Sequence, residues 1–528
     1  MCIEIALRQE PQGAAQQKQP LCCFRTGGGK RKEGHHEKTV FCNDSLCYAP
    51  EHFHLRTTAF GESASSDVHE PSAIHRKEMT FYLCDVNNTR VQSVYFIGDS
   101  DVPYISLEDW GELYPYLMKT HIEPDGHLEY GLAFSMDGAI AALTRTDGAP
   151  YSMTVDSAAD TITFYDYDAF IRHEADRVLI DILDADEAHS EEEKSIFRRT
   201  PDSYERYGDQ LVLNLGAYGI DVVADGNACY VPLQTLSDFL LAINYINLFY
   251  NGKAIFFADM DGLQDEETGS YSALGELFYS VEPRERSEAM GAFSYAELCL
   301  AMNMEYGLKD IHGISSFDSF DTVPEDVDYY KNAPTADARD TIGILAYAYS
   351  RIMREGSPVE NVVLDLSCNG GGEADAAVYT LSAFLGEGYA SVKNTMSGAL
   401  AMGVYEVDLN FDGKFDENDK GLTGKKLFCL ISPTSFSCGN LVPCVFKNSN
   451  DVTLIGRTSA GGSCVILPLT TADGTFFMIS GPKRLAFMKN GSFYDIDQGA
   501  DLDFVIPTPE LQFDRQYMTK YINSLLGK

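Results

Sequence analysis

The chain has 528 residues, which at about 100–200 residues per domain is enough for roughly two to four domains. Hydrophobic residues make up 45% of it and charged residues 23%, which excludes a wholly disordered, collagen-like or coiled-coil chain. The formal net charge of −39 repels nucleic acid and anionic lipid, so we expect neither as a partner. No stretch approaches the ~18 uncharged apolar residues of a membrane-spanning helix, so no such segment is expected.

Residues 1–78 differ in composition from the rest and are expected to be a disordered or anomalous leader. They lack the apolar region of about 7–15 residues that a secretory signal needs. Histidines and cysteines gather here at a spacing that fits no known metal site: His35, His36, Cys42 and Cys47. Most of the 13 cysteines lie in apolar runs, so we expect buried thiols and no disulfide framework.

Residues 79–285 alternate short apolar runs with turn residues, which predicts a β-rich α+β module. A weak internal repeat is visible in it, with an offset of 126 residues between Tyr104 and Tyr230. In each copy a short strand precedes a helical run, at Asp109 to Leu117 and at Leu236 to Leu241. Such units resemble the small amine-oxidase N-terminal-like domain of extracytoplasmic bacterial modules. We interpret the module as a binding or packing appendage without chemistry of its own.

Residues 286–528 have the alternating pattern of an α/β domain. Helical spacing follows Arg339, with Asp340 as the expected N-cap and Gly356 as the expected C-cap. The apolar run that follows, Val359 to Leu366, predicts a buried parallel strand. Further elements are expected as a helix at Ala374 to Leu385, a strand at Lys426 to Ile431, a helix at Gly439 to Lys447 and a strand at Val452 to Gly456. Helices between apolar strands predict a largely parallel sheet.

Two loops lie at the C-terminal ends of predicted strands, where open α/β sheets place their sites. The first, Asp365 to Gly372, has consecutive glycines that expose N–H groups and allow close approach of a substrate carbonyl. The second, Ser435 to Asn440, puts Ser437 between a strand and a helix N-terminus, where N–H groups stabilise developing negative charge. Taken singly, each loop is equally typical of a tight turn or a helix cap.

Together and in this order, the loops resemble the tail-specific, or carboxyl-terminal processing, protease family. The family pattern Asp-Leu-Arg-x-Asn-x-Gly-Gly matches Asp365 to Gly372, with Ser367 in place of Arg. The nucleophile pattern Thr-Ala-Ser-Ala-x-Glu aligns with Ser435 to Asn440 and makes Ser437 the nucleophile. Two later family patterns are approximated at Gly456 to Gly461 and at Gly499 to Asp503. The resemblance implies a ClpP/crotonase-like α/β protease core.

The general base is where the chain departs from the family. The processing branch uses a lysine that would fall at Gly462, and no lysine occurs between Lys447 and Lys483. The chain is therefore more similar to the tricorn-core-like branch, which lacks this dyad lysine and pairs its serine with an upstream histidine. His312, the sole histidine after His189, is the candidate base.

Two questions about this branch stay open in the sequence. The segment Tyr306 to Lys309 also matches a family segment that precedes the histidine motif, and on that alignment the histidine region is missing. The branch also uses a downstream acid, for which Asp497 and Asp495 are the candidates.

A separate pattern, Asp408 to Asp419, fits a twelve-residue Ca²⁺ loop. Oxygen-bearing side chains occupy positions 1, 3, 5, 9 and 12, and glycine occupies position 6. The expected ligands are Asp408, Asn410, Asp412, Asp416 and Asp419, with the backbone carbonyl of Lys414 at position 7. Aspartate at position 12 resembles dockerin-type loops. The alternative is an ordinary acidic turn on a very acidic surface.

These observations predict a serine-type endopeptidase that hydrolyses peptide bonds through an acyl-enzyme on Ser437. Gly371, Gly372 and Cys438 are expected to bind the oxyanion and the substrate. The expected partner is a protein or peptide substrate, and the expected metal is a structural Ca²⁺, with no cofactor for catalysis. Millimolar calcium favours an extracellular or cell-envelope bacterial protein, while the absent signal leaves the cytoplasm open. The alternative is a catalytically inactive peptide- or ligand-binding protein on the same scaffold.

Overall fold

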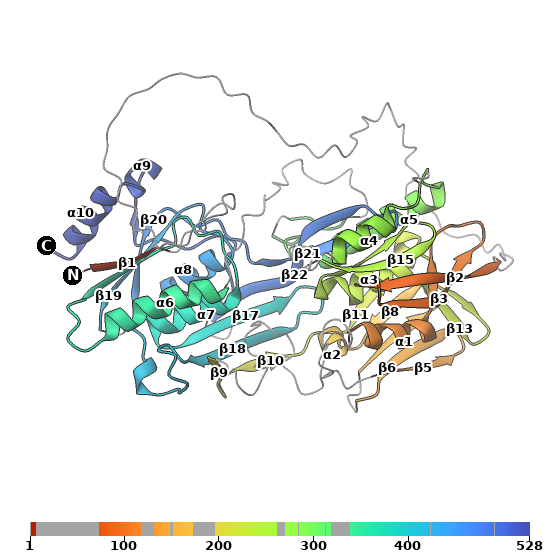
Figure 1. Ribbon diagram of the computed structural model, residues 1–528, viewed down its shortest axis with the longest axis horizontal. Helices are drawn as coiled ribbons and strands as arrows, with labels where there is room; N and C mark the ends of the chain where they lie inside the picture. Colours follow the sequence, from red (N-terminus) through yellow and green to blue (C-terminus); the bar gives the residue numbers. More distant parts are fainter. Residues whose placement is uncertain are drawn as a thin grey trace, which may run out of the picture. The chain divides into compact units, whose positions relative to one another are not determined.

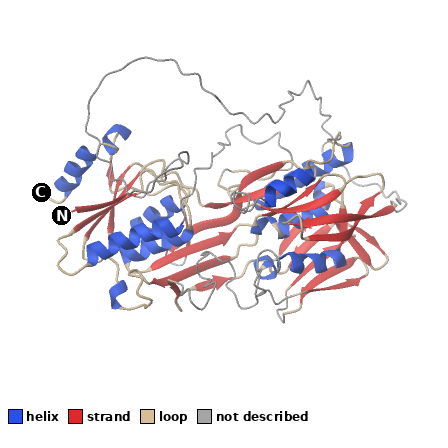
Figure 2. Cartoon of the chain, viewed as in Figure 1, coloured by secondary structure: helices blue, strands red, loops and turns tan. Residues whose placement is uncertain are grey.

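The computed structural model describes residues 2–6, 73–118, 131–147, 151–172, 196–260, 270–282, 285–311, 313–317, 338–422, 424–489 and 492–527. These residues belong to one compact unit, which combines the start of the chain with Ala73–Lys528. More of them lie in strands than in helices (Figure 2). Across these ranges, no helix has both the length and the apolar character that crossing a membrane requires.

Four strands of the C-terminal part and one strand from the start of the chain form a parallel sheet in the order β1-β16-β19-β20-β24. Their bounds are Cys2–Ala6, Asn361–Asp365, Lys426–Ile431, Val452–Gly456 and Phe504–Val505. The three central strands are almost wholly buried, as their apolar runs predict. The predicted α/β core with parallel strands is therefore confirmed.

Helices cover both faces of this sheet (Figure 1). One face packs against α6, α7 and α8, which span Ala338–Met353, Ala374–Leu385 and Cys438–Ser449. The other face packs against α9 and α10, which span Pro509–Gln512 and Arg515–Leu525. Helix α6 starts before the expected N-cap Asp340, because Ala338 and Arg339 are themselves strong helix formers. Gly356, with φ of 70°, lies in the turn beyond the helix end.

A second sheet of the C-terminal part was not predicted. Its order is β10-β18-β17-β22-β21, with β9 beside β18 and β23 beside β22, and its neighbouring strands are antiparallel. The bounds are β9 Phe197–Arg199, β10 Tyr204–Arg206, β17 Gly388–Asn394, β18 Leu400–Val407, β21 Cys464–Thr470, β22 Phe476–Lys489 and β23 Ser492–Asp495. Apolar runs mark strands but do not specify their partners, so this sheet was invisible in the sequence.

The N-terminal module contains two further sheets. A seven-stranded sheet has the order β12-β13-β4-β3-β2-β15-β14, and a five-stranded sheet has the order β11-β8-β7-β6-β5. The strand bounds are β2 Ile74–Leu83, β3 Thr89–Ile97, β4 Tyr104–Ser106, β5 Leu132–Asp137, β6 Ile140–Arg145, β7 Ser152–Asp156, β8 Thr161–Phe164, β11 Leu211–Asn214, β12 Val223–Asp225, β13 Ala228–Pro232, β14 Ile246–Tyr250 and β15 Ala254–Asp259. The helices are α1 Leu107–Leu117, α2 Tyr167–Ile171, α3 Leu233–Leu240, α4 Ser270–Phe278 and α5 Glu288–Glu305, with short 3₁₀ turns at Gly216–Tyr218 and Ala242–Asn244.

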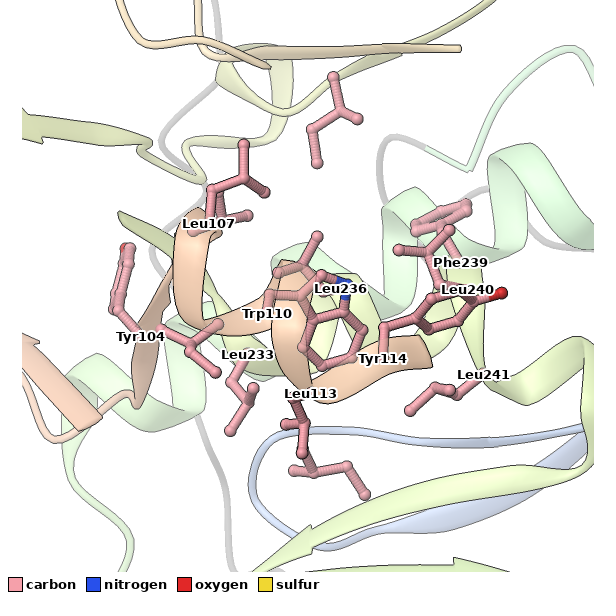
Figure 3. Packing of buried hydrophobic residues seen from close by; sticks show 14 of the residues in the cluster. Tyr104, Leu107, Trp110, Leu113, Tyr114, Leu233, Leu236, Phe239, Leu240 and Leu241 are labelled. Carbon is pink, nitrogen blue, oxygen red and sulfur yellow. The ribbon is translucent and has the colours of Figure 1, made fainter. Parts of the chain in front are cut away.

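The two copies of the sequence repeat lie side by side in this module. Strands β4 and β13 are antiparallel, and Ile105 lies opposite Val231, its equivalent in the other copy. A local two-fold axis through this pair therefore relates the copies. Helices α1 and α3 follow the strands directly and bury the equivalent residues Trp110 and Leu236 in one cluster (Figure 3).

The structure differs from the expected leader at both of its ends. Strand β1, at Cys2–Ala6, pairs in parallel with β16, and β2 begins at Ile74. Residues 7–72, which include the His35, His36, Cys42 and Cys47 group, lie outside the described residues. The unpaired N–H and C=O groups along the edge of a sheet can form backbone hydrogen bonds with an added strand of any composition. The composition of the leader therefore did not reveal β1.

The expected boundary at residues 285–286 does not divide the packing. Helix α5 follows the expected boundary and would therefore belong to the C-terminal core. It instead buries Met290, Phe293 and Leu300 in the same cluster as the N-terminal module. Strands β9 and β10, from the N-terminal side of the boundary, pair with β18. The module and the core therefore share both a sheet and a hydrophobic cluster.

Candidate active site

Ser437 has a backbone conformation that is rare for a residue with a side chain. It lies between β19 and α8, with φ of 53° and ψ of −127°. Its N–H donates to the carbonyl of Gly461 at 2.9 Å, and its own carbonyl accepts the N–H groups of Asn440 and Leu441 at 2.8 and 2.9 Å. Such strain costs of order 1–3 kcal/mol and persists only where the surrounding structure over-determines it. A serine in a strained strand-to-helix turn of this kind is the usual setting of a nucleophile elbow.

The glycine loop lies directly against the serine turn. A Cβ on Gly371 would stand 2.5 Å from Ser437 Cβ and 3.1 Å from Ser437 Oγ. A Cβ on Gly439 would stand 2.5 Å from Asn369 Oδ1. The N–H of Phe436 donates to the carbonyl of Asn369 at 3.1 Å. The structure thus brings the two predicted loops together, and the contact requires glycine on both sides.

Three hydroxyl groups join the strand ends that carry these loops. Ser435 Oγ donates to the carbonyl of Leu366 at 2.8 Å, and the hydroxyls of Ser432 and Thr434 each lie 2.6 Å from the carbonyl of Ser367. Ser367, which replaces the family arginine, is buried and donates its own hydroxyl to the carboxylate at the end of β16 at 2.5 Å. Ser367 is therefore a buried residue that stabilises the glycine loop through this hydrogen bond.

The start of α8 supplies N–H groups suited to an oxyanion. Cys438 and Gly439 are its first two residues, whose N–H groups have no intrahelical partner, and the helix dipole favours an anion there. The N–H of Gly371 donates to Asn369 Oδ1 at 3.0 Å, so it must leave this bond to hold an oxyanion. A Cβ on Gly372 would meet nothing within 4 Å, so this glycine borders open space.

The thiol of Cys438 is not a competing nucleophile. Burial first, and then the nearby charges of Glu373 and Asp375, raise its pKa to about 12, against a smaller lowering by its hydrogen bond with Ser437. A thiol with this pKa is protonated at neutral pH, and the thiolate is the reactive form. Cys438 therefore offers the site its backbone N–H rather than its sulfur.

The position of the missing dyad lysine has no room for a side chain. Gly462 has φ of 86°, and a Cβ there would stand 2.4 Å from the ring of Phe436. Its neighbour Gly461 has φ of 79°, and a Cβ there would stand 2.5 Å from the carbonyl oxygen of Asp497. The turn after β20 thus requires glycine at both positions. The close packing of this turn explains why no lysine stands at position 462.

Asp497, a candidate acid, is bound by this same turn. Its Oδ1 accepts the N–H groups of Gly462 and Ser463, both at 2.9 Å. Its Oδ2 accepts Ser463 Oγ at 2.5 Å and Arg484 Nη2 at 2.7 Å. Burial opposes ionisation of Asp497, but the bonds from Ser463 and the Arg484 guanidinium outweigh it and lower its pKa. Asp495, the other candidate, accepts a second bond from Arg484 Nη2 at 2.8 Å.

The structure does not describe the position of the candidate base. His312 lies outside the described residues, and the sole histidine within them is His75 on β2 of the N-terminal module. Arg484 and Ser463, which the structure places beside the turn, were not predicted from the sequence. Arg484 could have been noticed because it is a charged residue directly before the apolar stretch Leu485–Phe487, which is buried in β22.

In the acidic loop between β18 and β19, aspartate side chains accept hydrogen bonds from backbone N–H groups of the same loop. Asp408 accepts the N–H groups of Asp412 and Gly413 at 3.2 and 2.7 Å, and Asp419 accepts those of Leu409 and Asp416 at 2.9 and 3.0 Å. A 3₁₀ turn at Glu417–Asp419 closes it. Within the ranges that the structure describes, no group of three or more His, Cys, Asp or Glu side chains is arranged to hold a metal ion. The oxygen donors are of the kind that Ca²⁺ takes, and the calcium site stays a prediction.

Residues 338–489, which contain both loops, match the family model described as peptidase family S41. This part of the chain is therefore similar to a peptidase S41 domain, and we refer to it as the S41-like region. This region is the part that the sequence likened to tail-specific proteases. The α/β core seen in the structure is consistent with it.

Individual relatives each match only part of the chain. A curated protein of Chlamydia pneumoniae is 30% identical over 103 residues, which are 19% of this chain and 16% of that protein. The chain therefore matches less than a fifth of the length of that relative. Among solved structures, a photosystem II D1 C-terminal processing protease superposes with a TM-score of 0.27 and 17% identity, covering 34% of this chain and 43% of that one. A putative peptidase from Parabacteroides merdae gives a TM-score of 0.27 and 20% identity, over 35% of this chain and 56% of that one.

Proposed function

We propose that this chain is a serine peptidase that hydrolyses peptide bonds through an acyl-enzyme on Ser437. The observation that carries the proposal is the strained backbone of Ser437 at the start of α8, directly against Gly371. A costly conformation of this kind, next to N–H groups suited to an oxyanion, is typical of a nucleophile. The S41 match over residues 338–489 supports the peptidase class.

In the proposed reaction, Ser437 Oγ attacks the carbonyl carbon of the scissile bond. Its hydroxyl is almost wholly protonated at neutral pH, so a base must accept the proton, and we assign this role to His312. The N–H of Cys438 stabilises the oxyanion, joined by that of Gly371 once it leaves Asn369. His312 then protonates the leaving amine, and water hydrolyses the acyl-enzyme by the same path.

A fluorophosphonate probe, which reacts with activated serines, tests this assignment. We expect wild type to be labelled and Ser437→Ala to be unlabelled. Ser449→Ala, at the far end of α8, is the matched control and should be labelled like wild type. His312→Gln should lose labelling while it keeps its fold. Labelling that survives in Ser437→Ala would refute the nucleophile, and labelling that survives in His312→Gln would refute only the base.

The closed glycine turn favours the tricorn-core-like branch within this proposal. Gly462 has no room for a side chain, so the serine needs a partner other than the lysine of the processing branch. The second candidate function, a peptide-binding protein without hydrolysis, is favoured by the same missing lysine. Peptide binding without labelling or cleavage in wild type would establish it.

We further infer a structural Ca²⁺ in the loop from Asp408 to Asp419, on the spacing of its oxygen donors. Loops of moderate affinity fill at the millimolar calcium found outside cells. A loop of this kind supports an extracellular or cell-envelope location, which detection of the native protein in the secreted or envelope fraction would test.

A further inference from the structure

Arg484 is a buried cation that binds three groups beside the serine turn. It lies on β22 with 8% of its surface exposed. Its Nε donates to Ser463 Oγ at 3.0 Å, and its Nη2 donates to Asp497 Oδ2 at 2.7 Å and to Asp495 Oδ1 at 2.8 Å. A guanidinium offers five donors in a planar fork, so one side chain orients all three groups at once.

Asp497 extends this anchor to the backbone beside the nucleophile. Its Oδ1 accepts the N–H groups of Gly462 and Ser463, both at 2.9 Å. Gly461, the residue before them, accepts the N–H of Ser437 at 2.9 Å. Hydrogen bonds and one peptide turn therefore connect the Arg484 guanidinium to the strained residue. The turn also packs closely against the backbone of Asp497. A Cβ on Gly461 would stand 2.5 Å from the carbonyl oxygen of Asp497.

We propose that Arg484 is a positioning residue for the proposed hydrolysis, because it fixes Asp497 and the Gly461–Ser463 turn that holds Ser437 in its reactive conformation. The inference rests on the proposed function, and it says what maintains the nucleophile rather than which bond is cut. Arg484 does not replace the missing lysine as a base, since a guanidinium stays protonated in proteins. It supplies a fixed charge behind the turn.

The charges explain why an arginine is required at this place. Asp495 and Asp497 both bind the same Nη2 atom, so their carboxylates lie close together. Without the guanidinium they repel each other, and Asp497 must either move or take up a proton. In both cases the N–H groups of Gly462 and Ser463 lose a charged acceptor, and the turn under Ser437 loosens.

The kinetics of fluorophosphonate labelling test the proposal. In Arg484→Met we expect the rate constant for the covalent step to fall by about 10- to 100-fold, the loss typical of a small misplacement of a catalytic group. The apparent affinity for the probe should stay within about twofold, because binding does not use the guanidinium. Arg484→Lys keeps the charge but not the fork and should lie between Arg484→Met and wild type. Wild-type labelling by folded Arg484→Met would overturn the proposal.

A matched control separates positioning from stability. Arg145, in the N-terminal module, is also buried and pairs with Asp147 at 2.7 Å. Arg145→Met should lower the melting temperature as Arg484→Met does, yet leave the labelling rate constant unchanged. Equal loss of labelling in both variants would mean that Arg484 acts only through global stability.

The pH profile distinguishes the two roles open to Asp497. If it fixes the turn together with Arg484, Asp497→Asn and Arg484→Met lower the plateau of the labelling rate and leave its midpoint pH unchanged. If it instead orients His312, Asp497→Asn alone shifts the midpoint. A shift confined to Asp497→Asn would overturn the positioning network.

Hydrogen exchange tests the same network without relying on activity. Peptides that cover residues 435–440 and 457–464 should exchange faster in Arg484→Met than in wild type, and at the wild-type rate in Arg145→Met. Unlabelled wild type with this exchange pattern would refute the proposed function and retain the anchor. Unchanged exchange in Arg484→Met would refute the anchor, whatever the labelling shows.

Discussion

Ser437 differs from an ordinary helix-capping serine in its backbone rather than in its side chain. A capping residue normally has β-region dihedral angles, and its hydroxyl accepts an N–H from the first turn. Ser437 has φ of 53° and no side-chain cap bond. Its hydroxyl is therefore not used to stabilise α8, which agrees with a chemical role.

This conformation leads to a prediction about stability. Ser437→Ala keeps a Cβ in the strained conformation, whereas Ser437→Gly removes it. The free energy of unfolding of the glycine variant should therefore be about 1 kcal/mol larger than that of the alanine variant. Chemical denaturation of both variants measures the difference, and neither should react with the probe. An alanine variant as stable as the glycine variant would show that the turn is not strained.

Gly371 allows a second prediction about the close contact of the two loops. Gly371→Ala places a methyl group 2.5 Å from Ser437 Cβ, so probe labelling should fall by about 10²-fold or more. Gly398→Ala is the matched control, because Gly398 also has a positive φ, of 74°, but a Cβ there meets nothing within 4 Å. The control should lose only about 1 kcal/mol of stability and keep full labelling. Equal labelling of the two variants would contradict the assigned contact.

The loop from Asp408 to Asp419 connects β18 of the antiparallel sheet to β19 of the parallel sheet. Strand β19 leads directly into the serine turn. Unliganded, the carboxylates of the loop repel one another in a chain of net charge −39. An ion bound here would therefore order a connection between the two sheets of the S41-like region.

We expect millimolar Ca²⁺ to raise the melting temperature, and Mg²⁺ to raise it less because of its octahedral demand. A 100-fold excess over Kd, for example, corresponds to roughly 2.7 kcal/mol. Asp412→Ala, at ligand position 5, should abolish the shift. Glu417→Ala, at position 10 of the same loop, removes a charge without removing a ligand and should keep it. Identical shifts in both variants would mean that the ion acts by charge screening alone.

The N-terminal module and the S41-like region meet along the β21–β22 hairpin. Gln234, on α3, donates its Nε2 to the carbonyl of Thr470 at 2.7 Å and to Asp238 Oδ1 at 2.7 Å. Thr235, on the same helix, donates to Glu297 of α5 at 2.8 Å. The hairpin thus contacts a buried polar cluster at one end and carries Arg484 near the other.

Three buried carboxyl groups in and near this cluster predict a pH dependence of stability. Burial raises the pKa values of Asp238, Glu297 and Glu305 well above their ordinary range. The folded state then holds these protons more tightly than the unfolded state. The resulting stability is complete below the unfolded pKa of about 4 and is lost as the pH rises toward the folded pKa.

Glu297→Gln, which has no proton to lose, should weaken this decline by up to about 1.4 kcal/mol per pH unit. Urea unfolding at a series of pH values from about 5 to about 9 measures it. Glu288→Gln, an exposed residue in the first turn of the same helix, should follow wild type. Parallel profiles for Glu297→Gln and wild type would show that Glu297 is ionised in the folded protein.

Patterns that reside in short stretches of chain were predictable from the sequence. Apolar runs marked β16, β19 and β20 to within a few residues, and helical spacing marked α7 and α8. The glycine loop and Ser437 were found because tight turns and helix starts need particular residue types. Local backbone preference and burial decide these features, and both are encoded by neighbouring residues.

Features that depend on which distant segments meet were settled by the tertiary structure. Strand β1, the antiparallel sheet and the pairing of the repeat copies each join residues far apart in sequence. The contact of Arg484 with Ser463, on which its proposed role depends, likewise forms only because β22 lies beside this turn. Composition and periodicity describe one segment at a time, whereas pairing depends on the competition among all strands for partners. For this reason the sequence located the proposed nucleophile, Ser437, and the fold was needed to propose how its conformation is maintained.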